Sequence, residues 1–143
     1  MRLEISFRLG FNASGPILAS AIMLGLPSLA LSQEIIEVVD GQPITTVDVE
    51  QRSKLVEAGS KQPVPRAVVL ESLINEIRTV SEAKRRGIDV SDQEVNEIYE
   101  HAAIRMGIDP QKLTRLLQAA GAAETFKRRL RAQIAWTKLA GAK

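Results

Sequence analysis

Three consecutive cations, Lys84, Arg85 and Arg86, stand together in the middle of the sequence. Clustered lysine and arginine side chains can bind an anion such as the phosphate backbone of a nucleic acid. Cations are also common in the last turn of a helix, because they face the negative end of its dipole. Gly87 follows directly, and glycine is the usual left-handed residue after a helix. The order of residue types therefore favours a helix terminus over an anion site.

The residues after this run carry the pattern of a new helix. Ser91 and Glu94 have the spacing of a capping box, in which each side chain accepts a hydrogen bond from the other residue's backbone. Val90 and Val95 stand at the positions of a hydrophobic staple. We therefore expect a tight connection between two helices at this point.

Catalytic and metal-binding patterns are not found in the sequence. His101 is the only histidine, and it lies at helix spacing from Glu97 and Arg105, which is typical of a solvated helix flank. Cysteine is absent, which excludes disulfides, thiol catalysis and zinc–thiolate sites. No glycine-rich phosphate loop is found either. The sequence thus predicts no catalytic residue, no metal site and no cofactor.

A second group of cations lies at 127–131. These residues alternate with Phe126 and Leu130, as on an ordinary amphipathic helix, and Glu124 stands four residues before Arg128, where it can pair with it. The net charge of the chain is only +2, so nucleic acid is not an expected partner.

The first 32 residues have the features of a secretory signal peptide. Arg2 and Arg8 precede an apolar run at 16–31, and small residues precede a cleavage site between Ser32 and Gln33. The run contains a proline and is shorter than the ~20 apolar residues that span a bilayer. We predict a cleaved signal peptide and a periplasmic protein with no stable membrane anchor; the alternative is an uncleaved anchor in the inner membrane.

The remaining residues, 33–143, suit one small domain, since the whole chain has 143 residues and is 45% hydrophobic and 25% charged. Two β-branched runs flank Asp40-Gly41, a pair typical of a type I′ hairpin turn. Pro43 places the second strand at a sheet edge.

Helical periodicity begins after the hairpin. Thr45 and Thr46 are possible N-caps of a first helix that ends at Gly59, and Pro65 opens a long second helix. The apolar spacing then predicts a third helix ending at Gly107, a short fourth ending near Gly121, and a fifth over 124–140. The predicted fold is mainly α, with a short N-terminal β-hairpin followed by about five helices. The buried stripe of the second helix is expected at Leu70, Leu73, Ile74, Ile77 and Val80.

Three stretches, in this order, resemble the N-terminal domain of SurA-type periplasmic chaperones and related parvulin-type prolyl isomerases. They are VVDGQPITTVDVEQRSKLV at 38–56, LINEIRTVSEAKRRGIDVSDQEV at 73–95 and RAQIAWTKL at 131–139. The resemblance implies a domain that holds unfolded or extended outer-membrane proteins without nucleotide. Parvulin active sites carry paired histidines, whereas this chain has His101 alone. The implied protein is thus a chaperone module and not an enzyme.

Two other functions remain open at this level: a fragment or relative of a peptidyl-prolyl isomerase, and a structural or dimerisation module of the cell envelope.

For the chaperone function, methionine and aromatic residues at helical spacing are candidates for an adaptable client groove, although the same spacing is typical of a core. A homodimer that shares the hairpin at 35–44 or the last helix is also expected. The predicted client-binding residues are Tyr99, Met106, Leu113, Leu117 and Trp136.

Overall fold

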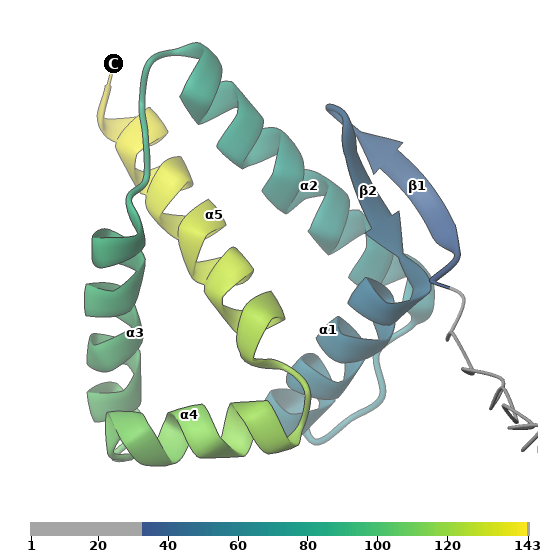
Figure 1. Ribbon diagram of the computed structural model, residues 1–143, viewed down its shortest axis with the longest axis vertical. Coiled ribbons are helices and arrows are strands. Elements are labelled where there is room, and N and C mark those ends of the chain that lie inside the picture. Colours follow the sequence, from purple (N-terminus) through teal and green to yellow (C-terminus); the bar gives the residue numbers. More distant parts are fainter. Residues whose placement is uncertain (1–32, 143) are drawn as a thin grey trace, which may run out of the picture. The chain divides into compact units, whose positions relative to one another are not determined.

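A computed structural model describes residues 33–142 as a β-hairpin followed by five helices (Figure 1). This confirms the predicted fold class. The predicted signal peptide at 1–32 lies outside the described residues and stays a prediction. The elements are β1 (Ile35–Val39), β2 (Gln42–Thr45), α1 (Thr46–Ser60), α2 (Arg66–Arg85), α3 (Asp92–Arg105), α4 (Pro110–Ala119) and α5 (Ala123–Gly141).

The hairpin closes with the expected type I′ turn. Asp40 and Gly41 both have left-handed φ angles, 49° and 78°, which this turn requires at both central positions. The strands are antiparallel, with Val39 opposite Gln42 and Val38 opposite Pro43, and the register shifts near the start of β1.

Helix α1 begins as predicted and ends later than predicted. Thr45 forms a capping box with Asp48 at its N-terminus. The helix continues through Gly59 to Ser60, and Lys61 after it adopts a left-handed φ of 56° and donates its N–H to the Glu57 carbonyl. The expected stop at Gly59 was wrong, because a lysine takes the left-handed position that usually favours glycine.

Helices α2, α3 and α4 all end in the same turn. Gly87, Gly107 and Gly121 have φ angles of 71°, 68° and 66°. After each, the next residue donates its N–H to a carbonyl five residues back, as Ile88 does to Ala83 at 2.9 Å. This is the Schellman motif. The predicted glycine stops are thus confirmed for these three helices.

Two apolar clusters form the interior; α2 contributes to both and lies side by side with α5 (Figure 1). We call them the hairpin cluster and the helical cluster. The buried residues of the hairpin cluster are Val39, Ile44, Val49, Val69, Leu73 and Ile77. Those of the helical cluster are Ala83, Val90, Val95, Tyr99, Ala102, Ala103, Leu113, Leu117, Ala122, Phe126, Leu130 and Ala135. The stripe on α2 differs from the expected one, because Val69 is buried while Leu70, Ile74 and Val80 are only partly buried.

Candidate functional site

The basic run at 84–86 is a helix terminus with local ion pairs. Arg85 and Arg86 both donate to the Glu82 carboxylate, and Arg85 lies 3.7 Å from Asp40 of the hairpin turn. Hydrogen bonds from Arg86 and Arg85 lower the pKa of Glu82 below its ordinary value. The staple residues that follow, Val90 and Val95, are buried.

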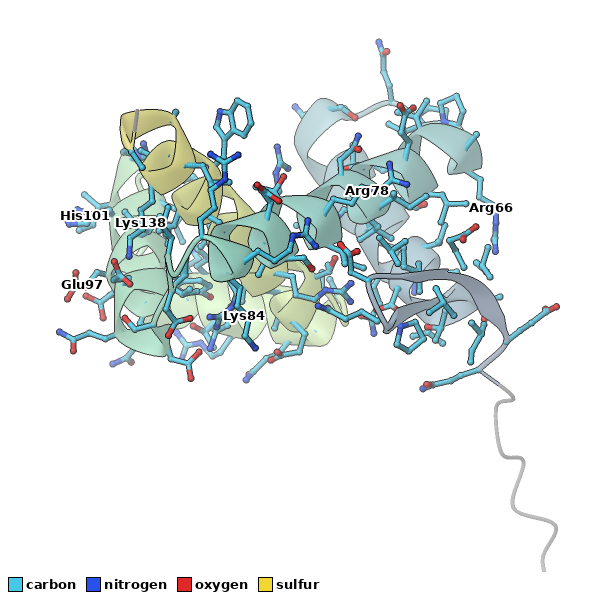
Figure 2. The ribbon with its side chains drawn as sticks, turned by 90° about the horizontal axis from the view of Figure 1, so that it is seen from above. Arg66, Arg78, Lys84, Glu97, His101 and Lys138 are labelled. Atoms are coloured by element: carbon cyan, nitrogen blue, oxygen red, sulfur yellow. The ribbon has the colours of Figure 1, made fainter. Side chains whose placement is uncertain are left out.

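Figure 2 shows Arg66, Arg78, Lys84 and Lys138 spread along the protein, so these four cations do not form one phosphate-binding patch. His101 is exposed on α3, and no cluster of three potential metal ligands occurs in the described part of the chain.

Three cations of α5, namely Arg128, Arg131 and Lys138, contact other elements. Arg128 donates to Asp48 at the start of α1 at 2.5 Å, so the expected pairing of Arg128 with Glu124 was wrong. Glu124 is exposed, whereas Arg128 is half-buried and pairs with Asp48. Burial raises the pKa of Asp48, but hydrogen bonds from Thr45 and the Arg128 guanidinium outweigh it and hold the pKa below its ordinary value.

Two further contacts join α5 to the start of α3. Arg131 donates to the Val90 carbonyl and to Asp92. Lys138 pairs with Glu94, and this hydrogen bond, with those from Ser91, lowers the pKa of Glu94 to about 2. Pairing with distant acids therefore accounts for these cations without a ligand.

A buried ionic bridge, absent from the sequence predictions, links the two clusters. Arg52 of α1 is 1% exposed and donates both terminal nitrogens to Glu76 of α2, at 2.5 and 2.7 Å. It also donates to the hydroxyl and the carbonyl of Thr125 on α5. One sequence feature could have indicated that Arg52 is buried. It follows Val49 by three residues, so the two side chains lie on the same, inner face of α1.

Three of the predicted client-binding residues are core residues in this conformation. Tyr99, Leu113 and Leu117 are buried in the helical cluster. The Tyr99 ring contacts Phe126 edge-on with centroids 5.6 Å apart, and its hydroxyl lies 3.0 Å from that of Thr114. Here these side chains are covered and cannot reach a client.

The other two, Met106 and Trp136, are exposed but lie apart. Met106 ends α3 beside the turn to α4, whereas Trp136 lies in the last turns of α5, 65% exposed. The five predicted residues therefore do not form one groove.

Trp136 instead belongs to a different concave surface. Between α2 and α5 lies an open hollow of about 650 Å³, lined mainly by polar and charged side chains, with Val68, Ala132 and Trp136 as its apolar members. A second hollow of about 340 Å³, between α3 and α5, is lined in part by Ile98 and Ile134. Both hollows share Gln133, so the exposed strip of α5 separates them. We call this strip with its two hollows the α5 face.

Comparison with known proteins gives one partial similarity. The chain is 30% identical over 108 residues to the trigger factor of Aliarcobacter butzleri (strain RM4018), a match that spans 73% of this chain and 25% of that protein. The chain thus covers about a quarter of the relative's length. No family model matches the chain, and no solved structure matches it. No helix among residues 33–142 is long and apolar enough to cross a membrane.

Proposed function

We propose that this chain is a SurA-type chaperone module that holds unfolded or extended polypeptide segments without ATP. The proposed clients are exported outer-membrane proteins, met in the periplasm. The similarity to trigger factor suggests a chaperone-like function in general. The SurA-type assignment and the location rest on the sequence resemblance and on the predicted signal peptide.

One observation carries the proposal: a tryptophan, 65% exposed, lines the hollow between α2 and α5, and Gln133 on the same helix also lines the second hollow. Single exposed apolar side chains are common on protein surfaces, but an aromatic anchor beside concave surfaces is typical of a binding site. Gln133 and Thr137 next to it are exposed and polar. A client segment would therefore bury one aromatic contact within a polar surround and would dissociate readily.

Suppression of aggregation tests this function. The full chain is mixed with an unfolded outer-membrane protein diluted from denaturant, and light scattering is followed without nucleotide. We expect suppression, with a roughly tenfold or greater loss of client affinity in Trp136→Ala, since a buried interface tryptophan contributes about 2 kcal/mol.

Leu116→Ala is the matched control, because Leu116 is 53% exposed on α4 and lines neither hollow. Equal losses in both variants, or no suppression by the natural chain, would contradict the proposal.

The remaining parts of the proposal have separate tests. N-terminal sequencing of the periplasmic protein is expected to give Gln33 as the first residue, while an intact Met1 in the membrane fraction would support the anchored alternative.

The chain is not expected to accelerate isomerisation of a proline peptide beyond the uncatalysed tens to hundreds of seconds. Sedimentation over a wide concentration range tests the predicted homodimer.

A further inference from the structure

We propose that the outer edge of β1 binds an extended, lysine- or arginine-bearing client segment as an added β-strand. This inference rests on the proposed function and adds a second contact to it. The edge lies on the hairpin, on the opposite side of β1 from β2 (Figure 1).

The register of the hairpin shows which backbone groups face outward. Val39 and Gln42 flank the two-residue turn and form the hydrogen-bonded pair next to it. Backbone groups alternate in direction along a strand, so the N–H and C=O of Val38 face away from β2. Its partner opposite is Pro43, which has no N–H and fits only at an outward-facing position.

The two edges of the hairpin therefore differ. At the level of Pro43 the outer edge of β2 lacks a donor, whereas β1 offers both a donor and an acceptor at Val38. Among residues 33–142 no hydrogen bond to the Val38 backbone is formed outside the hairpin. The side chains of Ile35 and Val38 are 58% and 56% exposed beside this edge. An open edge with exposed β-branched residues is a template for strand addition.

Charge indicates which strand fits. Residues 33–45 contain Glu34, Glu37 and Asp40 and no cation. Asp40 has Arg85 as a neighbour, but Glu34 and Glu37 are exposed and form no ion pair with the described residues. A second copy of β1 would bring like charges together across the strands, which is destabilising, whereas lysines or arginines would be attracted. The regular part of the edge is short, so binding would be reversible.

Amide hydrogen exchange of the full chain tests the inference, with a short peptide of alternating valine and lysine as the probe. With peptide at about ten times its Kd, exchange of the Val38 amide is expected to slow about tenfold, because exchange then requires release. A peptide with glutamate in place of lysine is expected to bind more weakly, and Glu37→Lys to weaken this preference.

Val38→Pro removes the outward N–H and keeps the β1–β2 ladder, so the Kd for the lysine peptide should rise about five- to tenfold. Val38→Thr keeps the N–H and should bind within about twofold. An unprotected Val38 amide, equal binding by Val38→Pro, or protection that grows with protein concentration alone would overturn the inference.

Failure here is distinguishable from failure of the proposed function. A chain that still suppresses client aggregation through Trp136 while Val38 stays unprotected would lose only the strand site. A chain that binds no unfolded client would lose the chaperone function itself.

Discussion

A buried ionic bridge joins the hairpin cluster to the rest of the protein, whereas helix caps set the turns between the helices that surround the helical cluster. In the hairpin cluster every buried apolar side chain is aliphatic, and Arg52 connects α1 to α2 and α5. In the helical cluster Tyr99 and Phe126 pack together, and glycine turns end the helices around them. Caps act over a few residues, while the Arg52 bridge joins residues 73 apart in sequence. The two clusters should therefore respond to different substitutions.

The largest effect is expected inside the helical cluster. Phe126→Ala removes a buried ring in contact with Tyr99, and this should lower the free energy of unfolding by about 3–5 kcal/mol. Urea unfolding measures the loss, and Phe126→Leu should recover a large part of it. A loss no greater than that of an exposed substitution such as Leu116→Ala would contradict the packing described here.

A somewhat smaller effect is expected at the bridge. Arg52→Met leaves Glu76, whose side chain is only 15% exposed, without its partner, and should cost about 3 kcal/mol. The double variant Arg52→Met with Glu76→Met removes both charges and should recover most of that loss. If the double variant is as unstable as the single one, the instability of Arg52→Met does not come from the unpaired charge of Glu76.

The caps between α2 and α3 should contribute less. Gly87→Ala should cost about 1 kcal/mol through the left-handed φ alone, because no atom lies within 4 Å of the added Cβ. Ser91→Ala should cost a similar ~1 kcal/mol through the lost N-cap. Thermal unfolding measures the stability loss in both variants.

Arg85→Gln and Arg86→Gln should lower the free energy of unfolding by less than the cap substitutions do, since these side chains are exposed, and client binding should not change.

The smallest effect is a pH dependence at Glu94. Because Lys138 and Ser91 lower its pKa to about 2, ionised Glu94 stabilises the fold above its unfolded-state pKa. That contribution is lost as the pH falls from about 4.3 toward 2. Glu94→Gln keeps the capping-box hydrogen bond but should flatten this part of the pH profile. A profile unchanged from the natural chain would show that the contacts of Glu94 with Lys138 and Ser91 do not lower its pKa in solution.

The hairpin turn and the ends of α2, α3 and α4 could be predicted from sequence, because Asp40-Gly41 and the three glycines act through local backbone geometry. The bridge could not, since Arg52 is an ordinary polar residue until Glu76 and Thr125 are brought against it. Tertiary packing likewise decided which of the predicted client-binding residues are accessible, and the sequence does not show that packing. Helical spacing places Tyr99 and Trp136 equally on apolar stripes, and only the packing of neighbouring helices buries one and leaves the other exposed.

Binding at the α5 face is the central functional claim, and the fluorescence of Trp136 tests it most directly. Trp136 is the only tryptophan in the chain, and it is 65% exposed. Titration with a tryptophan-free unfolded client, without nucleotide, should give a saturable shift of its emission to shorter wavelength that reverses on dilution. Emission that stays unchanged at client concentrations where aggregation is suppressed would contradict the claim and place client binding elsewhere.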